Sequence, residues 1–190
     1  MKEEIFFETI KCEDYEIFNL EYHQKRVART IGLNINLQDY IYPISEELLR
    51  CKVVYDKNEV LDVLYFPYHK REISSFKIIF DDNIEYHKKY LNRDELDSLF
   101  AQRGHQDEII IVKNGVVTDT SIANIAIFHD GVWITSKNSL LNGTTKDRLI
   151  EEKKLIEKDI SIDMLKNSSK IALMNAMIGF DIKDEYYIEF

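Results

Sequence analysis

Turn-forming residues are scarce in this chain, and their scarcity limits where it can change direction. The 190 residues include two prolines and six glycines, the residue types that punctuate secondary structure most strongly. Gly32 follows an expected helix, while Asn114-Gly115 and Asp130-Gly131 have the composition of tight hairpin turns. Between these turns, apolar residues alternate as in strands or repeat along one helix face. The pattern predicts an α+β fold without internal repeats.

The predicted elements fall into two groups, separated by a polar linker at 67–75. We therefore expect two domains, at 1–70 and 71–190. The first group has strands at 4–11 and 17–19, a helix at 21–31 and a hairpin of 51–55 with 60–66. The second group has helices at 94–102 and 144–158, a short element at 160–165, and strands at 76–80, 108–113, 122–129, 132–135, 170–175 and 185–190.

Charge and composition limit the possible partners. The 25 Lys and Arg residues face 34 Asp and Glu, a net charge of −9, whereas binding nucleic acid or anionic membranes usually needs a basic surface. We expect neither partner, although a few local donors can still hold a phosphorylated small molecule. No segment approaches the ~20 apolar residues of a membrane span, and no signal-peptide core follows the opening residues. Cys12 and Cys51 are too few for a disulfide framework or a thiolate zinc site, so we expect a cytoplasmic protein.

One segment combines a glycine with two hydroxyl residues just ahead of an amphipathic helix. Leu141-Asn-Gly-Thr-Thr-Lys146 places Thr144 and Thr145 at the expected helix N-terminus. Free backbone N–H groups and two hydroxyls at such a place form a site for an anion. Either threonine can instead cap the helix, which is the commoner use of a hydroxyl there. The sequence alone favours a cap and keeps phosphate binding as the alternative.

Two further polar signals lie in the second half of the chain. Lys88 and Lys89 stand among aromatic residues, where one amine with a lowered pKa would suit imine formation. A lysine pair is more often a solvated turn. Asp119 lies in a polar cluster at 115–124, where it can accept a hydrogen bond from a cationic ring nitrogen. A wide loop of Asx and Ser/Thr turns is the alternative for this cluster.

The helix expected at 21–31 carries two more candidates. Arg26 is a candidate phosphate ligand and His23 a candidate pocket residue, but exposed surface positions are the commoner interpretation of both. The five histidines have no metal-ligand spacing, and no glycine-rich phosphate loop of a known type occurs. We therefore expect no metal site.

Taken in order, these stretches resemble the class IV aminotransferase family of pyridoxal-phosphate enzymes. That family has the D-amino-acid aminotransferase-like architecture called fold type IV. The matching stretches are collinear and cover most of the chain: Phe7-Glu-Thr-Ile10, Asn19-Leu-Glu-Tyr-His-Gln-Lys-Arg26, Lys89-Tyr-Leu-Asn-Arg93, Asp107-Glu-Ile-Ile-Ile-Val-Lys-Asn-Gly115, Val117-Thr-Asp-Thr-Ser-Ile-Ala-Asn124, Leu141-Asn-Gly-Thr-Thr145 and Met174-Asn-Ala-Met177. The resemblance implies two small mixed α/β domains, pyridoxal 5'-phosphate as cofactor, a small-molecule amine substrate and a homodimer.

The resemblance also implies roles for single residues. Lys89, which precedes Leu-Asn-Arg, corresponds to the Schiff-base lysine, with Lys88 as its competitor. Asp119 stands where the family has the glutamate that pairs with the pyridine nitrogen, and Arg26 matches the arginine at the cofactor phosphate. The other implied cofactor-binding residues are Ser121, Ile122, Ala123, Thr144 and Thr145. Together they would anchor the cofactor, adjust its ring and move protons.

Three departures from the family pattern bear on the function. Asp119 is one methylene shorter than glutamate, and Asn142 and Lys146 replace a proline and an arginine that are frequent in the family. The chain begins almost at the Phe-Glu-Thr strand and is short between Arg26 and Lys89. The first domain is therefore expected to be a truncated small domain and the second the cofactor-binding domain, so the cofactor is better supported than any substrate.

Within the family, aminodeoxychorismate lyases are the most similar. The Lys-x-Leu-Asn-Arg pattern and the pair Asn175-Ala176 carry this likeness. The implied reaction converts 4-amino-4-deoxychorismate to 4-aminobenzoate and pyruvate, a step of folate biosynthesis. Transamination of an amino acid is the first alternative, because the same cofactor residues serve both reactions. A truncated relative without catalytic activity is the second.

Overall fold

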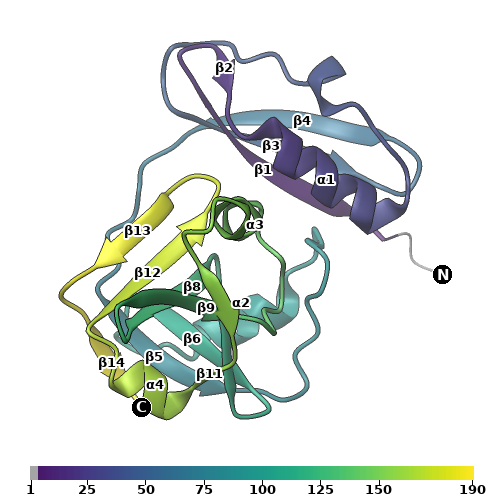
Figure 1. Ribbon diagram of the computed structural model, residues 1–190. Helices are drawn as coiled ribbons and strands as arrows, with labels where there is room; N and C mark the ends of the chain where they lie inside the picture. Colours follow the sequence, from purple (N-terminus) through teal and green to yellow (C-terminus); the bar gives the residue numbers. More distant parts are fainter. Residues whose placement is uncertain (1–3) are drawn as a thin grey trace. The chain divides into compact units, whose positions relative to one another are not determined.

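The computed structural model describes residues 4–190, and by their contacts the residues form two compact units (Figure 1). The first unit comprises the chain to Lys70 together with Lys88–Asn92, and the second comprises Arg71–His87 and Arg93–Phe190. The segment Lys88–Asn92, which the sequence places in the second domain, thus makes its contacts in the first unit. There the backbone N–H of Phe7 donates to the carbonyl of Lys89 at 3.0 Å.

The first unit is an antiparallel sheet with a helix on one face. Its strands are β1 (Phe6–Glu13), β2 (Glu16–Ile17), β3 (Leu49–Tyr55) and β4 (Val60–Pro67), in the order β2-β1-β3-β4. The helix α1 (Leu20–Ile31) lies over the sheet, and a short 3-10 turn, η1 (Leu37–Asp39), follows it (Figure 1). Strand alternation turns Phe6, Ile10 and Cys12 to the helix side, where they pack with Val27. Gly32 ends α1 in the left-handed conformation, with φ of 75°.

The second unit is built on a larger mixed sheet. Its main path runs β10-β9-β8-β7-β6-β5-β14, β11 pairs with β7, and β12 pairs with β8 and β13. The strands are β5 (Ser75–Phe80), β6 (Glu108–Lys113), β7 (Val116–Thr120), β8 (Asn124–His129), β9 (Val132–Ser136), β10 (Ile156–Lys158), β11 (Ile160–Ser161), β12 (Lys170–Asn175), β13 (Gly179–Lys183) and β14 (Tyr187–Glu189). The helices are α2 (Asp94–Ala101), α3 (Thr144–Glu151) and α4 (Ile162–Lys166). The predicted α+β class is confirmed.

Two predictions of secondary structure are wrong, and one strand was missed. The helix expected at 144–158 ends at Glu151, and its last part is the strand β10, which pairs parallel to β9. Residues 116–120, interpreted as part of a polar loop, form β7, a strand next to β6 and β8. The strand β13 was not predicted at all. The first helix of each unit, α1 or α2, lies where the sequence predicted it, and so does the hairpin of β3 with β4.

Candidate functional site

A buried ionic cluster occupies the helix side of the first unit's sheet. Glu8 on β1 is fully buried and accepts two hydrogen bonds from Arg26 on α1: one from Nε at 2.8 Å and one from Nη2. Arg26 is 7% exposed, so its interpretation as a surface residue is wrong. A paired, two-pronged contact of this kind fixes the guanidinium plane. The contact with Glu8 is made through Nε and Nη2.

His23 belongs to the same cluster. Its Nδ1 lies 2.6 Å from Glu8 Oε2 and the side chain is 0% exposed, so the exposed position favoured by the sequence is wrong. Burial lowers the pKa of His23, against the opposing effect of Glu8. A neutral ring that donates through Nδ1 presents a lone pair on Nε2, and Nε2 is buried without a partner among residues 4–190.

The charges around Glu8 also set its own protonation. Burial raises the pKa of Glu8, but the Arg26 charge and the His23 and Arg26 hydrogen bonds outweigh it and lower the pKa from 4.5 to about 2. Glu8 is therefore ionised at neutral pH. The sequence did carry a signal for it: Glu8 alternates with the core residues Phe6 and Ile10 on β1, so the strand period turns a carboxylate inward.

The side chains of Lys88 and Lys89 make different contacts. Lys88 Nζ lies 3.7 Å from a Glu4 carboxylate oxygen and 5.2 Å from the Phe6 ring centroid. Lys89 Nζ lies 4.5 Å from the ring centroid of Phe7, and its charge contributes to lowering the pKa of His23. Both are half-buried, so neither lies in a fully solvated turn.

In the second unit, the turn between β7 and β8 carries Ser121, Ile122 and Ala123. Ser121 and Ala123 are buried, while Ile122 is 41% exposed. Three side chains from distant parts of the chain hold the turn: Arg93 Nη2 donates to the Ser121 carbonyl at 2.8 Å, Asn175 Nδ2 donates to the Ile122 carbonyl at 3.3 Å, and Glu108 Oε1 accepts from the Ser121 N–H at 3.3 Å. Four of the family-like stretches therefore meet here: the one that contains the turn and the three that hold it.

Asp119 is the last but one residue of β7, directly opposite Asn124 of β8. It is 5% exposed, and it accepts hydrogen bonds from the Asn124 side-chain amide at 2.5 Å and from the backbone N–H groups of Leu140 and Leu141 at 2.5 and 3.2 Å. Burial raises the pKa of Asp119 to about 6, although these hydrogen bonds work against it. A carboxylate has about four acceptor positions, so three bonds leave room for one more donor.

The N-terminus of α3 carries no side-chain cap. Gly143 is the N-cap residue in an extended conformation, so the capping role that the sequence favoured for Thr144 or Thr145 is wrong. Both threonines are buried in the first turn. A Cβ on Gly143 would lie 2.0 Å from Oδ1 of Asn124. A glycine is therefore needed where the start of α3 meets the Asp119–Asn124 pair, and the uncapped N–H groups with two hydroxyls suit an anion.

Lys146 stands where the family has arginine, and its buried structural role was not predicted from the sequence. It is 0% exposed, and its Nζ donates to the Ser136 carbonyl at 2.7 Å and to Ser139 Oγ at 2.8 Å. A Glu157 oxygen lies 3.1 Å away. Lys146 thus ties α3 to the ends of β9 and β10, and its charge also lowers the pKa of Asp119.

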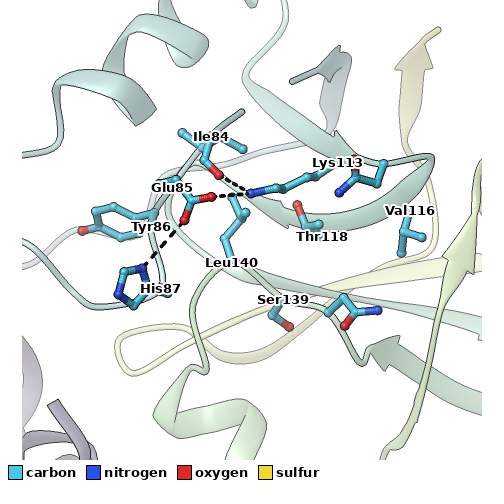
Figure 2. Close-up of a pocket in the computed structure, with 11 residues that line it drawn as sticks. Ile84, Glu85, Tyr86, His87, Lys113, Val116, Thr118, Ser139 and Leu140 are labelled. Atoms are coloured by element: carbon cyan, nitrogen blue, oxygen red, sulfur yellow. Dashed lines mark hydrogen bonds and ion pairs between the residues drawn. The ribbon is translucent and has the colours of Figure 1, made fainter. Parts of the chain in front are cut away.

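A pocket of about 340 Å³ opens on the second unit, next to the segment Ile84–His87 (Figure 2). Inside it, Lys113 Nζ donates to the Ile84 carbonyl at 2.6 Å and to Glu85 at 3.1 Å. His87 Nδ1 lies 3.9 Å from the other Glu85 oxygen. Lys113 and His87 of this pocket thus both lie beside Glu85, and none of the predicted cofactor residues lines the pocket.

The described residues contain neither a metal-ligand cluster nor a membrane-spanning helix. Across residues 4–190, no three His, Cys, Asp or Glu side chains gather as a metal site would require. Over the same range, no helix has the length and apolar character needed to cross a membrane. Cys12 and Cys51 are both buried free thiols on neighbouring strands.

The fold and these residue groups define the fold type IV class. A crystal structure of a "putative 4-amino-4-deoxychorismate lyase" from Haemophilus somnus is similar with a TM-score of 0.86 and 33% identity, over 94% of this chain and 99% of that chain. The PLP-bound form of a hypothetical aminotransferase from Mycobacterium tuberculosis is similar in fold, with a TM-score of 0.76 at 15% identity, over 98% of this chain and 81% of that chain.

The family follows from two sequence comparisons. The family model described as "Amino-transferase class IV" matches residues 84–182. An uncharacterized protein of Haemophilus influenzae is 36% identical over 184 residues, which span 91% of this chain and 97% of that protein. The chain therefore belongs to the class IV aminotransferase family, and its short length is shared by that relative.

Membership of this family implies pyridoxal phosphate as the cofactor, and the residues present fit it. The α3 N-terminus offers uncapped N–H groups and two hydroxyls for a phosphate. Asp119 is a buried carboxylate with room for one more donor, as a protonated ring nitrogen requires. Lys89 supplies an amine, and Arg26 a buried cation held in a fixed plane.

Proposed function

We propose that this protein is a pyridoxal-phosphate enzyme acting as an aminodeoxychorismate lyase, which converts 4-amino-4-deoxychorismate to 4-aminobenzoate and pyruvate. The observation that carries the proposal is the likeness to the Haemophilus somnus protein over nearly the full length of both chains. The Lys89-Tyr-Leu-Asn-Arg93 pattern and Asn175 support it from the sequence. Arg93 and Asn175 both hold the β7–β8 turn, which gives these motif residues a physical role.

The proposed cofactor ligands divide by the part of the cofactor they suit. Arg26, Thr144 and Thr145 are assigned to the phosphate, because a cation, two hydroxyls and uncapped N–H groups all favour an anion. Asp119 is assigned to the ring nitrogen, since a cation beside a buried carboxylate stabilises its ionised form. Ser121, Ile122 and Ala123 are assigned to the rim of the ring.

Lys89 is the proposed catalytic residue. When bound, pyridoxal phosphate would supply an aldehyde for an amine and a ring that accepts electrons. The lyase reaction needs a base that takes a proton from the amine-bearing carbon, and Nζ of Lys89 would hold that proton. The C–O bond to the enolpyruvyl group would then break, and the enolpyruvate would take up a proton at its methylene carbon, from Lys89 or a water, to become pyruvate. Lys89 is preferred to Lys88, because Lys89 is the lysine that stands in the Lys-x-Leu-Asn-Arg pattern of the family resemblance.

Borohydride trapping tests the cofactor assignment directly. Reduction of the purified protein with pyridoxal phosphate should fix the cofactor covalently, and peptide mapping should place it on Lys89. Lys89→Ala should lose the label while keeping its fold, and Lys88→Ala is the matched control that should keep it. A label on Lys88, or one spread over surface lysines, would contradict the assignment.

Product analysis then tests the reaction. With 4-amino-4-deoxychorismate, the protein should release pyruvate and 4-aminobenzoate in equal amounts, and Lys89→Ala should release neither. Amino-group transfer from an amino acid to a keto acid without pyruvate release would instead identify a transaminase. A mapped imine lysine with neither activity would indicate a non-catalytic relative.

We also propose a homodimer, as the family resemblance implies. Sedimentation of the protein with bound cofactor should give twice the chain mass of 22.5 kDa. A monomer at the concentrations used for activity would refute this part of the proposal and leave the cofactor assignment standing.

A further inference from the structure

The face of the first unit's sheet opposite α1 carries two neighbouring cations and two aromatic rings, with Asp62 of β4 and the Lys11–Glu13 pair of β1 on the same face. Strand alternation places Phe7 on this face of β1, Arg50 and Lys52 on β3, and Leu64 and Phe66 on β4. The register sets Lys52 opposite Leu64 and Arg50 opposite Phe66. We call these five residues the outer face. All of them are half-buried or exposed.

Neither Arg50 nor Lys52 pairs with an acidic residue in the part of the chain that the structure describes. Arg50 lies over the Phe66 ring at 5.0 Å, and Lys52 Nζ lies over the Phe7 ring at 5.3 Å. Among residues 4–190, neither has a carboxylate within ion-pair distance. In a chain with 34 acidic residues and 25 basic ones, leaving two neighbouring cations without acids concentrates positive charge on one strand. Such a place attracts an anion.

Lys89 shares a contact with this face. Its Nζ lies 4.5 Å from the same Phe7 ring that Lys52 covers. The two ammonium groups therefore stand against one aromatic side chain, although they come from segments far apart in sequence. A small-molecule amine at Lys89 has Lys52 in its surroundings and the Phe7 ring as an aromatic surface on which a flat ring can stack, and Arg50 lies two residues along β3 from Lys52.

We propose that Lys52, with Arg50, binds a carboxylate of the amine substrate and makes the enzyme selective for substrates with two carboxylates. The inference rests on the proposed function through the role of Lys89. A charge-assisted hydrogen bond from an ammonium to a carboxylate is stronger than a neutral one, so it distinguishes a second carboxylate from a neutral substituent. Lys52 and Arg50 are specificity-determining residues in this assignment, and no proton moves through them.

The test measures binding of two unreactive probes to the cofactor-loaded protein by calorimetry. Isophthalate has two carboxylates on a benzene ring, and benzoate has one. The natural sequence should bind isophthalate more tightly, and Lys52→Met should reduce the ratio of the two affinities about tenfold, as loss of one charge-assisted hydrogen bond predicts. Met keeps the aliphatic contact with Phe7, and Lys52→Arg should retain most of the preference.

Lys25→Met is the matched control. Lys25 is an exposed lysine on α1 whose Nζ lies 4.7 Å from the Tyr22 ring centroid, so it repeats the cation–ring contact away from the outer face. The Lys25→Met variant should have the same ratio of isophthalate affinity to benzoate affinity as the natural sequence. Equal ratios for Lys52→Met and the natural sequence, or an equal loss in Lys25→Met, would overturn the inference.

Two outcomes separate this inference from the proposed function. If the borohydride label maps to Lys89 in both the natural sequence and Lys52→Met, but the affinity ratio does not change, the inference fails and the cofactor assignment stands. If Lys52→Met weakens pyridoxal phosphate itself and leaves the ratio unchanged, the outer face serves the cofactor phosphate and the inference is again overturned. A ratio that falls in Lys52→Met while Lys89 gives no label would support the dicarboxylate site and refute the proposed function.

Discussion

Replacing Glu8 with glutamine should destabilise the protein at neutral pH and less so in acid. The folded chain holds the pKa of Glu8 at about 2, against 4.5 for an unperturbed carboxyl. Each pKa unit corresponds to about 1.4 kcal/mol, so the ionised carboxylate contributes about 3 kcal/mol to the free energy of unfolding. Glutamine keeps the shape but leaves Arg26, which is 7% exposed, without a counter-charge.

The pH dependence gives this prediction its sign. A carboxyl with a lowered pKa stabilises the folded state above its unfolded pKa, near 4.5, and this contribution is lost as the pH falls towards 2. Urea denaturation should therefore show a difference of about 3 kcal/mol between the natural sequence and Glu8→Gln at neutral pH. By about pH 3.5 the difference should shrink by about 1 kcal/mol, because the unfolded carboxyl is then mostly protonated.

Glu13→Gln is the control on the same strand. Glu13 pairs with Lys11 at 2.6 Å on the surface, where both side chains keep about a third of their exposure. Its replacement should change the free energy of unfolding by less than about 1 kcal/mol. Equal stabilities of Glu8→Gln and the natural sequence at neutral pH would refute the buried-cluster argument, as would a difference that stays constant into acid.

Two further predictions concern the second unit. Gly143→Ala should lower the free energy of unfolding by about 2 kcal/mol or more, because the new Cβ would lie 2.0 Å from Oδ1 of Asn124. The control is Asn142→Ala, one residue earlier and exposed, which should change the free energy of unfolding little. Equal effects of the two variants in calorimetric melting would count against the close contact. Burial raises the pKa of Asp119 to about 6, so in cofactor-free protein its contribution to the unfolding free energy should fall as the pH rises from about 4 to 6. Asp119→Ala should flatten that slope in urea titrations, and an unchanged slope would contradict the raised pKa.

The sequence predicted the elements that follow simple periodic patterns. The helix α1 begins within a residue of its expected start and ends before Gly32, and the β3–β4 hairpin lies around Lys57-Asn58 as expected. In both cases, local chemistry decides the structure: a glycine with positive φ ends the helix, and two apolar runs flank a polar turn. The roles of the cofactor residues stay predictions, because they depend on a ligand rather than on the chain alone.

The end of α3 could not be predicted because an unusual residue makes the turn. Lys153 has a φ of 59°, a conformation that favours glycine, and the N–H of Lys154 donates to the Leu149 carbonyl at 2.8 Å. No glycine or proline marks this position in the sequence. Burial of Leu155 and pairing of β10 with β9 compensate for the cost of that backbone conformation.

The strand β7 was missed because its buried residues are polar. Thr118, Asp119 and Thr120 are all nearly inaccessible, which a polar cluster does not suggest. Each one has partners: Thr118 Oγ1 donates to the Ile111 carbonyl at 3.0 Å, and Thr120 Oγ1 bonds to Ala123 across the turn. Satisfied hydrogen bonds allow polar side chains in a core, and only the three-dimensional structure reveals them.

The charges of the two residue groups complement the proposed cofactor. In the first unit, Arg26 is a buried cation bonded to the carboxylate of Glu8, while burial favours the neutral form of His23. A buried cation attracts an anion. In the second unit, Asp119 is a buried carboxylate whose raised pKa shows that its ionised form lacks full compensation, which a cation supplies. Pyridoxal phosphate carries an anionic phosphate and a ring nitrogen that takes a proton, so its two charges are of the kinds that the two groups attract. Glu8 is ionised at neutral pH, so it stabilises Arg26 in the fold and at the same time reduces the charge that Arg26 presents to an anion.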